Sequence, residues 1–238
     1  MKMKHVVGAL VICMMAATAA QATTYARYTG TVRHYEVVGI PGYSGVLAGT
    51  YVLEVKEGQG GTVQSYDSFC VDVVDPAETA FSVYTTLQLE NAPITSSGDI
   101  TMGTTRADDI RKLFGLMGNL PINLNTAGMA AAFQAAVWEI IKETTTGNYY
   151  LDTGNWQTTG LTQMVTANGW LALINADSGN TMFKDTTVNV LASSNYQDYA
   201  IVGGYIPPVP EPLTMASAFF AIAGLGGYIR RRTGRAAA

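Results

Sequence analysis

The chain has 238 residues, of which 48% are hydrophobic and 13% charged, and its formal net charge is −4 at pH 7. Between positions 23 and 208 lie 8 of the 14 basic and 17 of the 18 acidic residues, so this part carries about −9. Nucleic acid and anionic membrane surfaces are poor partners for such a charge. The same part holds one cysteine, Cys70, and one histidine, His34, which excludes an internal disulfide and a Cys/His metal site. We therefore expect no metal and no cofactor.

Residues 1–22 have the three parts of a secretory signal peptide. Lys2 and Lys4 give a positive start, and an apolar run follows over 6–20. Ala20-Gln21-Ala22 then supplies the small residues that a signal peptidase cleaves after. The segment predicts export and one extracellular domain over 23–206.

The first third of that domain has the composition of strands. Segments rich in β-branched and aromatic residues alternate with turns at Pro41-Gly42 and over 58–61. The pattern predicts strands over 31–38, 50–56, 66–74 and 81–89. In the third of these, Cys70 lies on the face opposite Phe69.

The middle changes to a helical period. Apolar residues at three- and four-residue spacing predict a helix over 106–117, with Thr105 as its cap and Gly118 as its stop. A second helix is predicted over 127–143 behind a cap at Asn125 or Thr126. A third, over 161–176, is expected to be interrupted at Asn168-Gly169.

Strands are predicted again over 186–191 and 196–202. The order of strands, helices and strands predicts an α+β domain, in which a helical insertion is carried on a β-sheet or barrel that its own C-terminal strands close.

The C-terminal segment over 207–238 has a Pro-rich start, an uncharged run of 17 residues over 213–229, and a cluster at Arg230, Arg231 and Arg232. The run is just long enough to cross a bilayer as a helix, and the arginines would stay on the cytoplasmic side. A plain membrane anchor would account for these features.

Together with Pro210, Glu211 and Pro212, the segment resembles the PEP-CTERM sorting signal of Gram-negative bacteria. The resemblance implies a transient anchor in the inner membrane, recognition by an exosortase-type sorting enzyme, and cleavage near these three residues. It implies delivery to the cell surface or to the exopolysaccharide matrix of a biofilm.

The second predicted helix contains one uncharged polar side chain, Gln134, among residues that are apolar nearly all round. A buried amide without partners costs on the order of 1–3 kcal/mol, so Gln134 needs a partner or a purpose. A hydrogen bond to a loop carbonyl would satisfy it. Alternatively, the Cys70 thiol could displace ammonia from the carboxamide and form an internal thioester, shielded from water by Trp138, Phe133 and Phe69.

The segments Phe133-Gln134-Ala135-Ala136-Val137-Trp138 and Phe69-Cys70-Val71-Asp72 resemble the two motifs of the Cys-Gln thioester domains (TQXA type) of bacterial surface adhesins. Phe133 stands where that family has threonine. Residues 110–118 resemble the helix before the glutamine helix, and 196–199 the closing strand. The resemblance implies a covalent adhesin whose Cys70–Gln134 thioester reacts once with an amine or hydroxyl of a surface protein or polysaccharide, and which is not a turnover enzyme.

Two other interpretations stay open. The chain could be a non-covalent matrix protein of the same fold, in which Cys70 and Gln134 only pack. It could also be a cysteine hydrolase that pairs Cys70 with His34, although no orienting carboxylate or oxyanion motif is recognisable.

Overall fold

The computed structural model describes residues 23–73, 75–94, 100–120, 123–177, 179, 181–183 and 186–202. The predicted signal peptide over 1–22 lies outside these residues, and so does the predicted sorting signal over 207–238 with its apolar span, Pro210-Glu211-Pro212 and Arg230–Arg232. Within the described ranges, no helix combines the length and the apolar character that a bilayer span requires.

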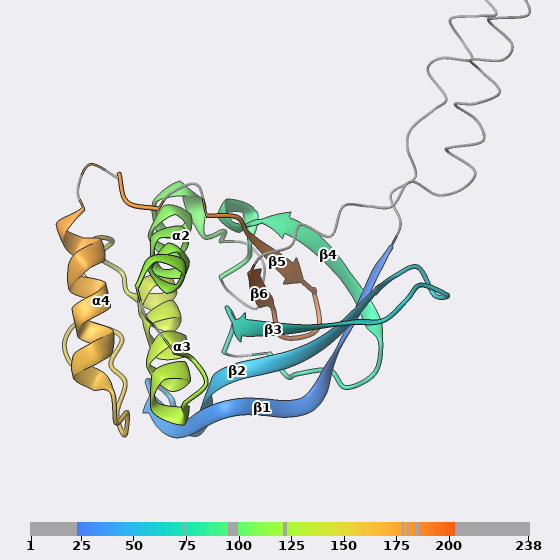
Figure 1. Cartoon of the computed structure of the whole chain (residues 1–238), viewed down its shortest axis with the longest axis horizontal. Coiled ribbons are helices and arrows are strands. Elements are labelled where there is room, and N and C mark those ends of the chain that lie inside the picture. The colour runs from blue at the N-terminus through green and yellow to red at the C-terminus, as the bar shows by residue number, and fades with distance from the viewer. Residues whose placement is uncertain are drawn as a thin grey trace, which may run out of the picture. The chain divides into compact units, whose positions relative to one another are not determined.

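The described residues form six antiparallel strands that close into a barrel, with the helices on one side of it (Figure 1). The strands are β1 (Thr24–Ile40), β2 (Tyr43–Glu57), β3 (Gln64–Cys70), β4 (Ser82–Gln88), β5 (Val188–Ala192) and β6 (Tyr199–Val202). Their order around the barrel is β1-β2-β3-β6-β5-β4. The mixed sheet-and-helix class predicted from the sequence is confirmed.

The first two strands form a long hairpin across the predicted turn at Pro41-Gly42, where Gly42 has a φ of 83°. Their register shifts between Tyr28 and Val32 and again between Arg33 and Glu36. Such bulges bend a strand and increase its twist, which lets β1 pair with β2 and also reach β4 to close the barrel.

All helices of the described part lie between β4 and β5 in the chain, so the predicted helical insertion is confirmed. They are the short 3₁₀ helix η1 (Leu89–Asn91), α2 (Gly103–Asn119), α3 (Ala127–Lys142) and α4 (Met164–Ala176). The apolar helix α3 packs on β1, β2 and β3, and α4 packs on α3 and α2 (Figure 1). The predicted cap of α3 is confirmed, because the Thr126 hydroxyl accepts a hydrogen bond from the Met129 N–H at 3.4 Å.

Several predicted boundaries are wrong. Helix α2 begins at Gly103, so Thr105 does not cap it, and it runs past Gly118 to Asn119, whose side chain donates to the Gly115 carbonyl. Helix α4 passes through Asn168 and Gly169 without interruption.

The ends of the strands also differ from the prediction. Strand β3 ends at Cys70 rather than at position 74, and β5 begins at Val188 rather than at 186. Strand β6 begins at Tyr199 rather than at 196, which leaves Gln197 in the connection before it.

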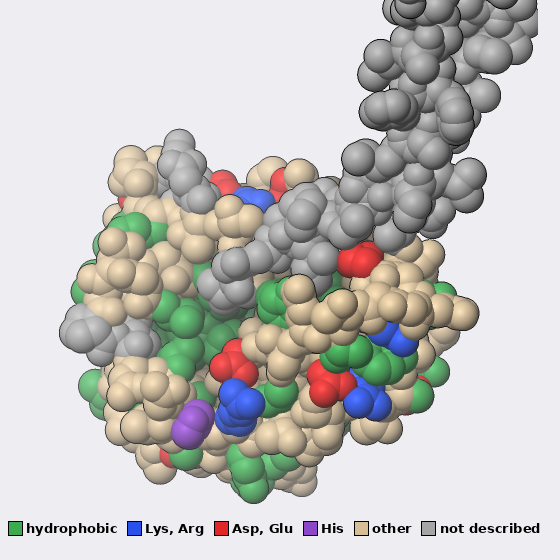
Figure 2. All heavy atoms as spheres, turned by 45° about the vertical axis from the view of Figure 1, so that its right-hand side comes forward, with side chains coloured by type: hydrophobic (Ala, Val, Ile, Leu, Met, Phe, Trp, Pro, Cys, Tyr) green, Lys and Arg blue, Asp and Glu red, His purple; other side chains and the backbone are tan. Residues whose placement is uncertain are grey.

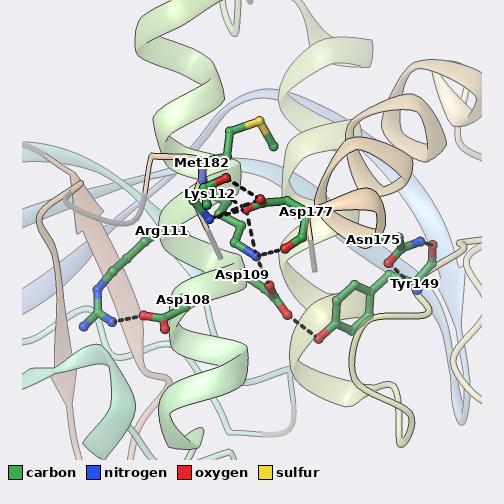
Figure 3. Close-up of polar contacts among 9 residues, drawn as sticks. Asp108, Asp109, Arg111, Lys112, Tyr149, Asn175, Asp177 and Met182 are labelled. Carbon is green, nitrogen blue, oxygen red and sulfur yellow. Dashed lines mark hydrogen bonds and ion pairs between the residues drawn. The ribbon is translucent and has the colours of Figure 1, made fainter. Parts of the chain in front are cut away.

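A buried polar network ties α2 to the end of α4 (Figure 3). The Lys112 ammonium lies 2.9 Å from a carboxylate oxygen of Asp109 and 3.4 Å from one of Asp177. The other Asp109 oxygen accepts a hydrogen bond from the Tyr149 hydroxyl at 2.8 Å. Since each charge has partners, this network can lie inside the helical layer without an uncompensated ion.

Candidate functional site

The centre of the site is Cys70, a fully buried residue at the end of β3. Its N–H donates to the Gln134 Oε1 atom at 2.8 Å, and its carbonyl accepts from Gln134 Nε2 at 2.8 Å. Strand β2 pairs with β3 only as far as Ser68, so the amide of Gln134 takes the place of a neighbouring strand at Cys70. The structure therefore brings the two predicted residues together, but Gln134 binds the main chain of Cys70 rather than its sulfur.

The sulfur itself faces a different glutamine. The thiol donates to the carbonyl of Asp72 and accepts a hydrogen bond from Nε2 of Gln197. Gln197 Nε2 also donates to the Asp72 carbonyl, at 3.0 Å. A nucleophilic thiol and a buried carboxamide thus lie in contact, 127 residues apart in the chain.

Gln197 is held at its main chain and at its side chain. Its N–H donates to the Pro76 carbonyl at 3.1 Å, and its own carbonyl accepts from the Tyr84 hydroxyl at 3.4 Å. The side-chain Oε1 atom accepts from the Tyr199 hydroxyl at 3.0 Å. The amide therefore has a fixed orientation, with its nitrogen toward the sulfur and its oxygen toward Tyr199.

Burial makes the free thiol a weak acid. It raises the pKa of Cys70 to about 12, and the nearby Asp72 adds to the rise, whereas the neighbouring Trp138 indole and the hydrogen bond from Gln197 oppose it. The Trp138 indole N–H is buried and makes no hydrogen bond in the structure. Little thiolate therefore exists near neutral pH, in contrast to the low-pKa cysteines of thiol enzymes.

Carboxylates lie beside the site on the two segments that meet there. Asp198 is buried and accepts from the Ser193 N–H at 2.7 Å. Burial, together with the charges of Asp72 and Asp75, raises the pKa of Asp198 to about 7. Burial and a hydrogen bond with Asp72 raise the pKa of Asp75 to about 6. Protons can therefore be held next to the amide at neutral pH.

The predicted aromatic shell falls into two parts. Trp138 interacts with the Cys70 thiol, as described above. Phe69 and Phe133 pack against each other, with ring centroids 4.7 Å apart. Phe114 packs on both rings, and Phe133 also contacts Trp170 on α4. This cluster joins β3 to α2, α3 and α4.

His34 does not lie with Cys70. It lines a separate pocket of about 440 Å³, next to Arg33 and Asp67, and Cys70 does not line this pocket. A Cys70–His34 hydrolase pair therefore has no geometric support. Among the described residues, no group of three or more His, Cys, Asp and Glu side chains is arranged to hold a metal ion.

Sequence reasoning missed Gln197 as a neighbour of the sulfur. The available signal was its position: a glutamine between Tyr196 and Asp198, just before the strand that closes the sheet. Strand β6 pairs Tyr199 with Cys70, so the residue two positions before Tyr199 is brought to the end of β3. Comparisons with protein-family models, curated proteins and solved structures find no match for this chain.

Proposed function

We propose that this chain is an exported surface protein that attaches covalently to its target through an internal thioester of Cys70, and that Gln197 supplies the acyl group. The observation that carries the proposal is the contact between the Cys70 sulfur and the Gln197 amide nitrogen inside a water-excluding site. Trp138, which lies on the same helix as Gln134, is fully buried beside this sulfur.

The geometry favours Gln197 over the sequence-based choice of Gln134. Both hydrogen-bonding ends of the Gln134 amide are engaged by the Cys70 peptide, an arrangement that satisfies the buried amide without any reaction. The Gln197 amide instead presents its leaving nitrogen to the thiol. Gln134 then fixes the position of Cys70, and Gln197 reacts.

The chemistry is a pair of acyl transfers. In the first, the sulfur attacks the Gln197 Cδ atom, the C–N bond breaks, and the thiol proton leaves with the nitrogen as ammonia. In the second, a target amine or hydroxyl attacks the same carbon, the C–S bond breaks, and the proton of the nucleophile passes to the sulfur. The product is an amide or ester that joins Gln197 to the target, so each molecule reacts once.

Export and sorting complete the proposal. The predicted signal peptide and the PEP-CTERM-like segment would deliver the acidic domain through the inner membrane and an exosortase-type enzyme to the cell surface or the exopolysaccharide matrix. A thioester there could capture a surface protein or a polysaccharide. A non-covalent matrix protein with an unreacted Cys70 is the second candidate, because the same contacts also satisfy Cys70, Gln134 and Gln197 as a packed core.

The first test is the mass of the Cys70 and Gln197 peptides from the full chain, purified in detergent, before and after methylamine treatment. We expect the wild type to lack one ammonia, and methylamine to add at Gln197 while a free thiol appears at Cys70. Cys70→Ala and Gln197→Ala should abolish both the loss and the addition.

Gln134→Ala is the matched control for the choice of glutamine. It should lower stability by about 1–3 kcal/mol, because it leaves the Cys70 peptide buried without partners, yet leave Gln197 able to react. If methylamine is found on Gln134 of the wild type, Gln134 and not Gln197 supplies the acyl group of the thioester. An unmodified mass and an unreactive thiol in the wild type would instead support the non-covalent protein.

A further inference from the structure

The Gln197 carbonyl oxygen has a dedicated donor. The Tyr199 hydroxyl lies 3.0 Å from Oε1, and the two residues are two positions apart in the chain. The opposite end of the amide is fixed by the Asp72 carbonyl at 3.0 Å. The amide cannot rotate without breaking both contacts, so its oxygen stays at the hydroxyl.

The donor is itself held rigidly. Tyr199 is fully buried, and its ring lies against that of Tyr51 with centroids 5.9 Å apart. Tyr51 is fixed in turn by its own hydroxyl, which donates to the Leu47 carbonyl at 2.8 Å. Burial, reinforced by the neighbouring Cys70, Tyr84 and Tyr51, raises the pKa of Tyr199 far above its ordinary value. The phenol therefore keeps its proton and can donate at any physiological pH.

Acyl transfer needs a donor at this oxygen. When a sulfur or an incoming nucleophile adds to Cδ, the carbonyl double bond opens and negative charge collects on Oε1. A preorganised donor that already points at this oxygen stabilises the charge without reorganising. Removing one such donor from an oxyanion site costs about 10²–10³ in rate.

We propose that Tyr199 is a catalytic residue, whose hydroxyl is the oxyanion donor in both acyl transfers at Gln197. The role rests on the proposed Cys70–Gln197 thioester. In thioester formation the hydroxyl stabilises the negative charge on Oε1 while the C–S bond forms and the C–N bond breaks. In target capture it stabilises the same oxygen while the bond to the nucleophile forms and C–S breaks.

The test compares Tyr199→Phe with Tyr84→Phe in the full chain. Both variants remove one hydroxyl from a buried tyrosine beside Gln197, but Tyr84 bonds only the main-chain carbonyl of that residue. The readouts are the fraction of chains that have lost ammonia and the second-order rate of methylamine addition. We expect Tyr199→Phe to slow methylamine addition about 10²–10³-fold, and Tyr84→Phe to slow it far less, because it loosens a main-chain contact of Gln197 but leaves the donor at Oε1 in place.

A second substitution keeps the test independent of folding. A fluorinated tyrosine placed at position 199 alone preserves the ring and makes the hydroxyl a stronger donor, so it should speed methylamine addition. Equal rates for the wild type, Tyr199→Phe and the fluorinated chain would overturn the role of Tyr199 only. A wild type that neither loses ammonia nor takes up methylamine would overturn the thioester as well.

Discussion

Two carboxylates, Glu139 on α3 and Glu143 directly after its last residue, have opposite surroundings. Glu139 is fully buried; Oε1 accepts from the Tyr150 N–H at 2.9 Å and Oε2 has no partner. Burial therefore raises the pKa of Glu139 to about 8, and the neighbouring Glu143 charge adds to the rise. Burial also opposes the ionisation of Glu143, but four main-chain N–H groups outweigh it and hold its pKa below the ordinary value.

Replacing Glu139 with Gln should stabilise the protein as pH rises. The folded state binds the Glu139 proton more tightly than the unfolded state, whose carboxyl has a pKa near 4.5. Wild-type stability therefore falls as pH rises from about 4.5 to about 8, and a glutamine removes this fall. We expect Glu139→Gln to gain on the order of 1–2 kcal/mol relative to the wild type between pH 5 and pH 8 in urea denaturation.

Glu143→Gln is the control, and its effect has the opposite sign. The lowered pKa of Glu143 contributes stability above its unfolded pKa and loses it as pH falls. Glu143→Gln should therefore destabilise at neutral pH, with the difference shrinking in acid. A Glu139→Gln variant whose stability curve runs parallel to that of the wild type from pH 5 to pH 8 would contradict the assignment of a buried, protonated carboxyl.

The two glutamines show how far single residues could be predicted. A polar side chain in an apolar helix identified Gln134 as buried, because helical period is a local pattern. Its pairing with Cys70 came instead from thiol and amide chemistry and from the resemblance to thioester domains. Gln197 has no such local pattern. Its contact with the sulfur follows from the pairing of β3 with β6, and single-sequence periodicity carries no information on that pairing.

At the scale of elements, α3 was predictable because its period and its Thr126 cap agree. The predicted break in α4 was wrong for a tertiary reason: the Asn168 side chain accepts from the Leu151 N–H at 2.9 Å and donates to Asp152. These bonds engage a side chain that would otherwise compete with the helix. The early end of β3 is likewise a consequence of long-range contacts, with Val71 donating to the Asp198 carbonyl.

The link between α2 and α4 depends on Lys112. Removing one member of a buried charge network leaves its partners uncompensated. Lys112→Met keeps the apolar stem of the side chain but removes the cation that Asp109 and Asp177 share. We expect a loss of about 3 kcal/mol in the free energy of unfolding, measured by chemical denaturation at pH 7.

Arg111 is the matched control, because it is the adjacent cation on α2 and also bonds two carboxylates, Asp108 and Glu90. Its side chain is 19% exposed against 4% for Lys112, so water screens its ion pairs more strongly. Arg111→Met should cost no more than about 1 kcal/mol. Equal losses in the two variants would show that burial does not set the strength of the Lys112 network.

At the scale of the whole domain, the candidate site lies where the barrel closes. Strands β3 and β6 pair through Ser68–Ile201, Phe69–Ala200 and Cys70–Tyr199, and all three helices lie in the chain between these strands. The face shown in Figure 2 carries acidic and basic side chains intermixed, with apolar side chains between them. A Cys70–Gln197 bond would therefore be both the reactive group and a cross-link around most of the domain.

Opening the thioester should consequently destabilise the domain. A cross-link between residues 127 apart restricts the unfolded chain, and cross-links of this kind contribute about 2–4 kcal/mol. For a domain of this size, such a loss lowers Tm by roughly 5–15 °C. We expect methylamine treatment to lower the Tm of the wild type by that amount in calorimetry, in proportion to the fraction modified at Gln197.

Cys70→Ala provides the reference, because it contains no cross-link and should melt at the same temperature with and without methylamine. The added methyl group is small, so packing changes at Gln197 cannot by themselves account for a drop of this size. If methylamine adds fully to the wild type and Tm does not change, the bond that methylamine opens is not a stabilising cross-link of the domain.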